Sequence, residues 1–329
     1  MRTVVTGGAG FIGSHLVDRL LADGHSVRVL DNFSTGRPDN LAHLAREPRL
    51  SLERVDVAEP GALGDLLAGA DWVFHLAALA DIVPSMERPL DYHRANVDGT
   101  VALLEAARAS GVRRFLYAAS SSCYGIPDLY PTPETAPARP QYPYALTKYL
   151  GEQCVLHWGQ VYRMPVVSLR LFNVYGPRSR TSGTYGAVFG VFLAQKLNGH
   201  PFTVVGDGTQ SRDFTFVSDV ADAFVTAAQS QVAGEVFNVG TGAPVPVNRL
   251  VELLGGDVTH VPKRPGEPDR THADIAKIQS RLGWRPKVSI EEGVGILLDN
   301  IEYWRQAPVW TPESIETATR AWFRYLGKE

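Results

Sequence analysis

A glycine-rich segment, "TGGAGFIGSHL", lies between the first apolar run of the chain and a helical pattern. In it Gly7, Gly10 and Gly13 recur every third residue, and Gly8, Gly10 and Gly13 also match the form GxGxxG. Glycine permits a tight turn, lets a pyrophosphate lie against amide groups at a helix N-terminus, and allows the helix to pack closely on the strand. Its place between a strand and a helix predicts a dinucleotide-binding loop, against the alternative of a plain glycine-rich turn.

The next apolar run, "SVRVLD", ends at Asp31, close to the spacing expected of a carboxylate that binds the ribose of a dinucleotide. A carboxylate there favours NAD over NADP because it would repel a 2′-phosphate, although Arg37 lies near enough to leave NADP open. Asp56 ends the third expected strand in "RVDV". It is interpreted either as a contact to the adenine or as a helix N-cap before "AEPGAL".

Apolar, β-rich runs alternate with helical patterns through the first two-thirds of the chain. The runs are "TVVTG", "SVRVLD", "LSLERVDV", "WVFHLA", "RFLYAAS" and "VVSLRLFNVYG". This order predicts an α/β fold, a Rossmann-type doubly wound parallel sheet with helices on both faces. Ligands of such sheets bind beyond the carboxyl ends of the strands. The residues at those ends are Gly7 to Gly13, Asp31 and Asn32, Asp56, Ala77 and Ala78, Ser120 to Ser122, and Asn173.

The pattern changes after "VYGP". A loop rich in Gly, Ser, Thr and Arg precedes a helix expected near Tyr185 to Asn198 and the short strands "FTVVGD" and "RDFTFV". We therefore expect residues 1–176 to form the dinucleotide-binding domain, with 212–239 returning to it. Residues 177–211 and 240–329 would form a smaller mixed α/β lobe that binds the substrate.

Composition excludes several classes of partner. The 329 residues carry a formal net charge of −3 with both signs interspersed, which is not the basic footprint of a nucleic-acid or membrane-surface binder. The two cysteines, Cys123 and Cys154, show neither disulfide nor zinc-site spacing, so no metal is expected. No apolar run reaches the roughly 18–20 residues of a spanning helix, and the N-terminus enters a strand rather than a signal peptide. We expect a soluble cytoplasmic protein.

The stretch "YPYALTKYLGE" places Tyr144 and Lys148 four residues apart at the start of a helical pattern, so their side chains share one face. Leu146, Leu150 and Cys154 form another stripe, along which we expect the helix to pack. Alone, the Tyr/Lys pair is typical of any exposed helix face. With a nicotinamide cofactor implied, the phenol becomes a candidate base if Lys148 and the positive nicotinamide ring lower its pKa from about 10. Ser120, in "AASSSCYG", is the candidate that orients the substrate hydroxyl.

The chain resembles the extended short-chain dehydrogenase/reductase family and, within it, the nucleotide-sugar epimerases. The resemblance spans nearly the whole chain. It rests on the motifs "TGGAGFIGSHL", "DNFSTG", "HLAA", "ANVDGT", "SSSCYG", "PYALTK", "RLFNVYGP", "GDGTQSRDF" and "RPGEPDRTHAD", which occur in the family's order. It implies NAD as the cofactor. The residues expected to hold it are Gly7, Gly10, Phe11, Ile12, Gly13, Asp31, Asn32, Ser34, Gly36, Asp56, Val57, Leu76, Ala77, Ala78, Asn96, Ser120, Tyr144 and Lys148.

The resemblance also implies a mechanism. Tyr144 would remove the proton of a sugar hydroxyl, usually at C4, while a hydride passes to NAD; the 4-keto sugar would turn over and take the hydride back on its other face. Lys148 would lower the pKa of the tyrosine and hold the nicotinamide ribose, and Ser120 would hydrogen-bond the reacting oxygen. Relatives that dehydrate or decarboxylate the sugar carry acidic residues where this chain has Ser121 and Ser122. This departure favours simple epimerisation.

On the substrate side, Arg212 and Arg264 match positions at which relatives hold the pyrophosphate, and Asn173 matches a phosphate-contacting amide. Glu267 would accept hydrogen bonds from the nucleotide ribose. The alternative for each arginine is a solvated or inter-lobe ion pair. Uridine is the commonest base among such relatives, but dTDP, GDP and CDP stay open.

The identity of the sugar is less constrained. Thr271 occupies a place where a tyrosine in some relatives excludes 2-acetamido sugars, so an acetamido group is not excluded. Arg178 or Arg180, in the loop "SRTSGTYGA" or just before it, would meet a C6 carboxylate if the sugar were a uronic acid, but an exposed loop is the favoured interpretation.

The predicted function is an NAD-dependent 4-epimerase of a nucleotide sugar, with a UDP-hexose as the expected substrate. The alternatives are net 4-oxidation, dehydration or decarboxylation of such a sugar and, more remotely, a non-catalytic NAD-binding sensor. His75 and the tryptophans Trp158, Trp284, Trp304 and Trp322 are interpreted as structural. Relatives commonly form homodimers through the helix after Asn96 and the Tyr/Lys helix, so a homodimer is expected.

Overall fold

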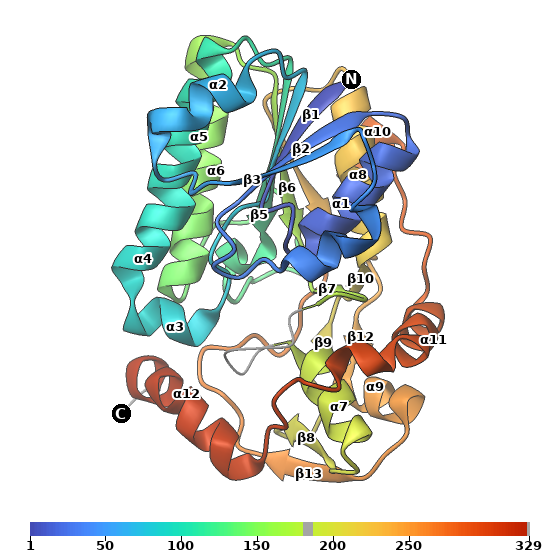
Figure 1. Cartoon of the computed structure of the whole chain (residues 1–329). Helices are drawn as coiled ribbons and strands as arrows, with labels where there is room; N and C mark the ends of the chain where they lie inside the picture. The colour runs from blue at the N-terminus through green and yellow to red at the C-terminus, as the bar shows by residue number, and fades with distance from the viewer. Residues whose placement is uncertain (180–186, 328–329) are drawn as a thin grey trace.

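Seven parallel strands form the central sheet of the protein, in the order β11-β6-β5-β4-β1-β2-β3 (Figure 1). The computed structural model describes residues 1–179 and 187–327. The strands are β1 (Arg2–Thr6), β2 (Ser26–Asp31), β3 (Leu50–Arg54), β4 (Trp72–His75), β5 (Arg114–Ser120), β6 (Val166–Leu171) and β11 (Glu235–Val239). The predicted doubly wound parallel sheet is confirmed, and β11 joins it beside β6.

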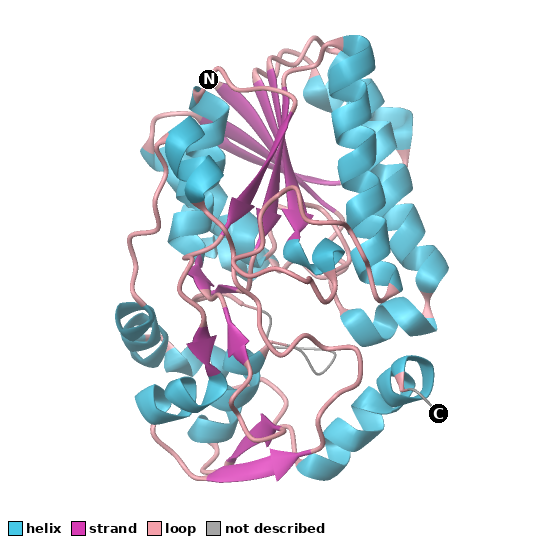
Figure 2. Ribbon diagram, turned by 180° about the vertical axis from the view of Figure 1, so that it is seen from behind, coloured by secondary structure: helices cyan, strands magenta, loops and turns pink. Residues whose placement is uncertain are grey.

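Helices cover both faces of this sheet (Figure 2). One face carries α1 (Phe11–Ala22), α8 (Val217–Gln229) and α10 (Ala276–Leu282); the other carries α2 (Leu63–Leu67), α5 (Gly99–Ala109) and α6 (Pro143–Tyr162). The strands are therefore apolar on both sides. In β1, Val5 packs in the core under α1 and α8, whereas Val4 packs under α5 and α6. Burial on both faces explains the nearly continuous apolar runs of the sequence.

Four of the expected strands end earlier than their apolar runs, and the difference is largest for β3 and β6. β3 ends at Arg54, so Asp56 lies two residues beyond the strand rather than at its end. The run "VVSLRLFNVYG" is divided at Phe172 and Asn173, where the Asn173 carbonyl accepts a hydrogen bond from the amide of Thr215 at 3.0 Å. The short strand β7 (Val174–Tyr175) follows and pairs with β10 (Thr215–Phe216), outside the main sheet.

The smaller lobe lies at the carboxyl ends of the strands (Figures 1 and 2). Its own core includes Phe192, Phe202, Leu250, Leu297 and Trp304. The lobe contains α7 (Val188–Leu197), β8 (Phe202–Val205), β9 (Ser211–Arg212), β12 (Val245–Pro246), α9 (Val247–Leu254), β13 (Val258–Val261), α11 (Ile290–Asp299) and α12 (Pro312–Leu326). The chain enters it after β7, returns to the sheet through α8 and β11, and enters it again with β12.

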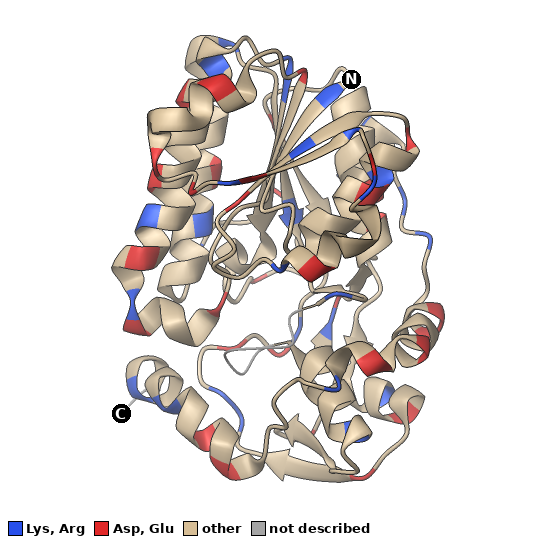
Figure 3. Ribbon diagram, in the orientation of Figure 1, with Lys and Arg blue, Asp and Glu red and all other residues tan. Residues whose placement is uncertain are grey.

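The remaining helices are short. Helices α3 (Ile82–Glu87) and α4 (Pro89–His93) follow β4, and the turn Arg94–Asp98 leads into α5. Basic and acidic residues are interspersed along both the sheet half and the lobe (Figure 3). Within residues 1–179 and 187–327, no helix combines the length and the apolar character that a membrane crossing requires.

Helix α6 packs on a different side from the one expected. Its buried residues include Ala145, Thr147, Lys148 and Glu152, whereas Leu146 is 44% exposed. Leu146 therefore faces outward and the face with Lys148 packs on the sheet. Leu150 and Cys154, the rest of the expected stripe, are partly buried, and Cys154 packs against the core. Hydrophobic spacing alone gave the wrong side because the buried face of this helix carries ionisable residues.

A matched pair of glycine substitutions tests the packing of α1. A Cβ added to Gly13 would lie 2.1 Å from the Gly7 carbonyl oxygen, whereas one added to Gly295, in α11, would meet nothing within 4 Å. We expect Gly13→Ala to lower the free energy of unfolding by about 1–3 kcal/mol through overpacking. Gly295→Ala should raise it by about 0.5–1 kcal/mol. Urea denaturation of both variants measures this, and equal effects would contradict the packing described.

Candidate active site

The site forms where the order of the strands in the sheet changes direction. Strands β1 and β4 are adjacent and parallel. Strand β2 lies beside β1 on one side of this pair, and β5 lies beside β4 on the other side. The arrowheads of the strands point toward the smaller lobe (Figure 2). Ligands of open α/β sheets bind at such a point.

The glycine loop between β1 and α1 leaves no room for side chains. Gly7 has φ +68°, and a Cβ there would lie 2.7 Å from the amide nitrogen of Ala77 in the loop after β4. Gly10 is the N-cap of α1, and no side chain caps the helix there. Phe11 and Ile12 form its first turn, whose amide groups therefore lack a side-chain acceptor. This bare helix N-terminus beside a close-packed loop fits the pyrophosphate of a dinucleotide.

Asp31 closes the same region from the end of β2. Its carboxylate accepts hydrogen bonds from the amides of Ala9 at 3.0 Å and Phe33 at 2.8 Å. A Cβ added to Gly36 would lie 2.7 Å from both carboxylate oxygens. The loop can therefore approach Asp31 this closely only because residue 36 is glycine. Burial raises the pKa of Asp31, and the two amide hydrogen bonds oppose that rise. The arrangement fits a carboxylate that holds the loop and approaches a ribose.

The residues beside Asp31 are connected to one another. Asn32 accepts a hydrogen bond from the Ser34 amide at 3.0 Å and donates to Asp56 at 3.3 Å. The other oxygen of Asp56 accepts from the amide of Ala58 at 2.9 Å, which closes a turn. Val57 is buried in the core beneath α5 and α6. Asp56 thus joins the loops after β2 and β3.

The loop after β4, Leu76 to Ala78, is attached to β1. Leu76 donates to the Thr6 carbonyl at 3.1 Å, and Ala77 donates to the Thr6 hydroxyl at 3.2 Å. That hydroxyl also lies 2.8 Å from His75 Nδ1, and His75 Nε2 lies 2.9 Å from the Thr100 hydroxyl. His75 is fully buried, and burial lowers its pKa to about 3. It acts as a neutral bridge between strands and helix.

Asn96 connects that loop to α6. Its Oδ1 accepts from the Leu79 amide at 2.8 Å, and its Nδ2 donates to the Leu79 carbonyl and the Thr147 hydroxyl, both at 3.0 Å. Thr147 in turn donates to the Tyr144 carbonyl at 3.0 Å. Both amide hydrogens of Asn96 are therefore used within the protein, and the residue positions the loop and the helix relative to each other.

Ser120 and Tyr144 meet at the end of β5. The Ser120 hydroxyl lies 2.8 Å from that of Ser122. Ser121 and Ser122 belong to the 3-10 turn that directly follows the strand. Burial raises the pKa of Tyr144, the nearby Ser120 side chain lowers it, and the negative charge of Asp81 adds to the rise. No sequence pattern pointed to Asp81, the residue before α3.

Lys148 lies one turn after Tyr144 and is 4% exposed. Its Nζ lies over the ring of Tyr117, 4.3 Å from the ring centre. Burial lowers its pKa to about 7, and the charge of Glu152 opposes that shift. The sequence led us to expect that Lys148 lowers the pKa of Tyr144. Within the protein itself the pKa of Tyr144 is raised instead, because burial dominates.

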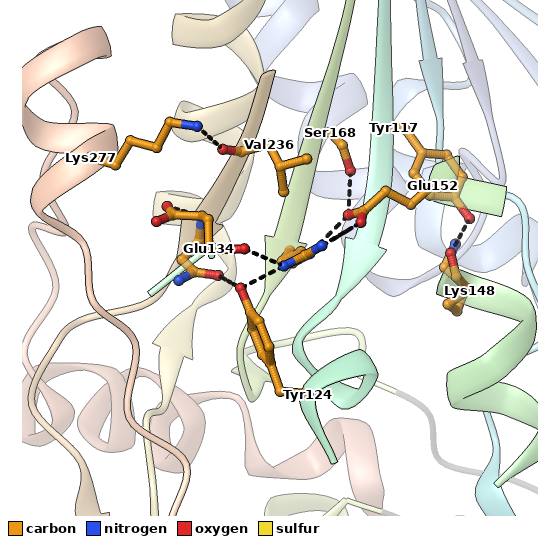
Figure 4. A network of polar contacts seen from close by, with 10 residues as sticks. Tyr117, Tyr124, Glu134, Lys148, Glu152, Ser168, Val236 and Lys277 are labelled. Carbon is orange, nitrogen blue, oxygen red and sulfur yellow. Dashed lines mark hydrogen bonds and ion pairs between the residues drawn. The ribbon is translucent and has the colours of Figure 1, made fainter. Parts of the chain in front are cut away.

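A buried polar network extends from α6 across β6 to β11 (Figure 4). Glu152 accepts hydrogen bonds from Ser168 at 2.9 Å and from Arg170 at 2.6 Å. Arg170 donates to the Tyr124 hydroxyl at 2.9 Å, which donates to Asn238 at 2.7 Å. None of the sequence motifs predicted this network. Two features of the sequence could have indicated it: a carboxylate four residues after Lys148 and an arginine inside a buried strand.

The predicted phosphate-binding arginines meet around one carboxylate. Arg212 in β9 contacts Glu267 at 2.7 Å, and Arg264 lies 3.8 Å from the other oxygen of Glu267. The side chains of both arginines are nearly buried, with 11% and 12% exposed. The ion pair considered as an alternative is present. Two guanidinium groups against one carboxylate leave a net positive charge, which fits a diphosphate.

Asn173 and Thr271 lie next to each other at the boundary with the lobe. The Thr271 hydroxyl donates to Asn173 Oδ1 at 2.8 Å and accepts from the Asp213 amide at 3.0 Å. Arg178 is held elsewhere, because it contacts Asp18 of α1 at 2.5 Å. Arg180 and most of the loop "SRTSGTYGA" lie outside the described residues. Across the described ranges, no group of three His, Cys, Asp or Glu side chains is placed to hold a metal ion.

A glycine loop at the switch point of a parallel sheet, with Ser120, Tyr144 and Lys148 beyond it, defines a dinucleotide-binding enzyme of the short-chain dehydrogenase/reductase type. The chain belongs to the NAD dependent epimerase/dehydratase family, whose model matches residues 3–240. The resemblance inferred from the motifs is thereby confirmed, and the family's cofactor is the one expected.

Individual relatives differ in activity. A UDP-glucose 4-epimerase of Mycolicibacterium smegmatis is 39% identical over 93% of this chain and 99% of that protein. UDP-glucuronic acid decarboxylase 1 of Arabidopsis thaliana is 36% identical over 89% of this chain and 68% of that protein. The structure of UDP-glucuronic acid 4-epimerase from Bacillus cereus with UDP-glucuronic acid and NAD is 32% identical, with a TM-score of 0.85. That match covers 92% of this chain and 99% of the epimerase chain.

The lowered pKa of Lys148 has a consequence for stability. The folded protein releases the Lys148 proton near pH 7, whereas the unfolded chain keeps it until about pH 10.4. Between these values the unfolded state binds more protons, so the free energy of unfolding rises with pH. The free energy of unfolding of the wild type, measured relative to that of Lys148→Met, should therefore rise by on the order of 4 kcal/mol from pH 7 to pH 10. Urea denaturation at stepped pH measures this; a constant difference would contradict a buried, neutralised lysine.

Proposed function

We propose that the protein is an NAD-dependent 4-epimerase of a nucleotide sugar and that its substrate is a UDP-hexose. The observation that carries the proposal is that Ser120, at the end of β5, is close enough to Tyr144 to lower its pKa, with the buried Lys148 one helical turn away. NAD, when bound, supplies a reversible hydride acceptor. Gly7, Gly13 and Asp31 would hold it, since their packing leaves a bare helix N-terminus and a ribose-facing carboxylate.

The protein's own residues perform the proton chemistry. Tyr144 accepts the proton of the C4 hydroxyl as the 4-keto sugar forms, and returns it when the sugar has turned over. Ser120 holds the reacting oxygen through its hydroxyl. Lys148, with a pKa of about 7, can change its charge near neutrality and so respond to the charge on the phenol.

Charged residues of the smaller lobe support a nucleotide sugar as the substrate. We propose that residues 1–176 and 212–239 bind NAD and that 177–211 and 240–329 bind the nucleotide sugar. Arg212 and Arg264 would hold the diphosphate, with Glu267 exchanging one guanidinium contact for a ribose hydroxyl. Several relatives are named for UDP-sugars, which supports uridine as the base.

Epimerisation is favoured over dehydration and decarboxylation by the turn after β5. Residues 121 to 123 are Ser, Ser and Cys, which provide no carboxylate for additional proton transfer. The proposed substrate is a hexose, with Thr271 leaving room for a C2 acetamido group.

We also propose that the protein is a homodimer that pairs through α5 and α6. The two helices are in contact, and α6 exposes Leu146, Val161 and Tyr162 by 44%, 51% and 48%. These exposed apolar side chains, at both ends of the helix, support pairing along its length. Light scattering of the purified protein should give twice the chain mass; a monomer at all concentrations would contradict this proposal.

The decisive substitution is Tyr144→Phe. With UDP-glucose and its acetamido and uronic analogues, the unaltered protein should interconvert C4 epimers of one sugar without net formation of NADH. Tyr144→Phe should lower kcat by about 10²–10⁴-fold with NAD still bound, because only the proton-transferring hydroxyl is lost. Tyr162→Phe, at the far end of the same helix, is the matched control and should be fully active.

Accumulation of NADH, or a pentose or dehydrated product, would instead indicate a 4-dehydrogenase, decarboxylase or dehydratase reaction. NAD binding without turnover of any nucleotide sugar would support the sensor alternative.

A further inference from the structure

The last helix of the lobe, α12, reaches the half of the protein that contains the sheet. Helix α12 begins with a capping box between Thr311 and Ser314, and its buried residues are Ile315, Thr319 and Trp322. It contacts α3, which follows β4 (Figure 1). The helix therefore connects the lobe to the edge of the proposed active site.

Trp322 lies against the loop that carries Arg264. It is 4% exposed, and its indole Nε1 donates a hydrogen bond to the Pro265 carbonyl at 2.7 Å. The guanidinium carbon of Arg264 lies over the indole ring, 5.4 Å from the ring centre. A Cβ added to Gly266 would be 3.7 Å from the side chain of Leu326, one turn further along α12. Three consecutive residues of this loop are thus in contact with α12 or close to it.

The same indole also faces the catalytic helix. Its ring centre lies 6.2 Å from that of Tyr142, and the ring of Tyr142 is stacked on that of Tyr144 at 6.3 Å with an interplanar angle of 9°. Trp322 therefore lies between the arginine proposed to hold the diphosphate and the aromatic neighbour of the proposed base. None of the motifs in the sequence includes it.

We propose that Trp322 is a positioning residue that orients Arg264 for the diphosphate, and that α12 is consequently part of the nucleotide-sugar site. This inference rests on the proposed function. An arginine side chain has many rotamers, and ordering it on binding costs free energy. A cation–π contact to a buried indole, on a loop fixed by the Pro265 hydrogen bond, orders the guanidinium group before the ligand arrives.

Two substitutions of Trp322 separate its two contacts. Trp322→Ala removes both and should weaken UDP binding and raise KM for UDP-glucose by about tenfold, with kcat changed by less than about twofold. Trp322→Phe keeps a ring beneath Arg264 but loses the hydrogen bond to Pro265, so a loss of about threefold is expected. Phe323→Ala, at the neighbouring and 40% exposed position, is the matched control and should bind UDP as the wild type does.

A double-substitution cycle tests whether Trp322 acts through Arg264. UDP binding is measured by calorimetry for Arg264→Ala and for Trp322→Ala combined with it. If Trp322 positions Arg264, adding Trp322→Ala to Arg264→Ala causes no further loss of UDP affinity. A purely structural tryptophan would lower the affinity by the same factor in both backgrounds, and that result would overturn the inference.

The outcomes also separate this inference from the proposed function. In one outcome, the unaltered protein binds UDP and epimerises its sugar, while Trp322→Ala and Trp322→Phe bind UDP as tightly as the unaltered protein does. That result would overturn the role of Trp322 alone and leave the proposed function standing. If Trp322→Ala does not fold, Trp322→Phe decides the question by itself. Unaltered protein that does not bind UDP would contradict the proposed function and, with it, this inference.

Discussion

The first helix can lie against the sheet only because the loop before it and its first turn have glycine at the points of closest approach. At Gly7 and Gly13 an added Cβ would come within 2.7 Å and 2.1 Å of backbone atoms, so the close approach of β1, α1 and the loop after β4 depends on glycine. That approach leaves the first amides of α1 without a side-chain cap. It also brings the Ala9 amide to the carboxylate of Asp31. The cradle for a dinucleotide follows from the packing itself, and the positions of the other strand ends follow from the parallel sheet.

Electrostatics in the catalytic helix works against the charged forms. Burial raises the pKa of Tyr144 and lowers that of Lys148 to about 7, so it disfavours the charged form of both groups. In the proposed mechanism the phenol would become a base through added positive charge nearby, which an oxidised nicotinamide carries. Glu152, itself paired with Arg170, supplies the one buried carboxylate that favours charged Lys148. The network of Figure 4 therefore connects the carboxylate that raises the pKa of Lys148 to the strands of the sheet.

Much of this arrangement could be predicted from the sequence. The apolar runs predicted the six strands of the first two-thirds, and their carboxyl ends predicted Gly7, Asp31 and Ser120 at one edge of the sheet. The spacing of Tyr144 and Lys148 predicted that they share one face of a helix. The buried side of α6 was predicted wrongly, because hydrophobic spacing cannot show that Lys148 and Glu152 are buried while Leu146 is exposed. Trp322 was interpreted as merely structural, since its contacts with Pro265 and Arg264 join segments 57 and 58 residues apart that no local pattern connects.

In the proposed epimerisation, a hydrogen leaves C4 of the sugar and returns to the same carbon within one site. The most direct test is to convert UDP-glucose labelled with deuterium at C4 and to analyse the epimeric product by mass spectrometry and NMR. We expect the product to keep the deuterium at C4 without any accumulation of reduced nicotinamide. Loss of the label to solvent, or a product that retains a ketone at C4 while NADH builds up, would contradict this mechanism.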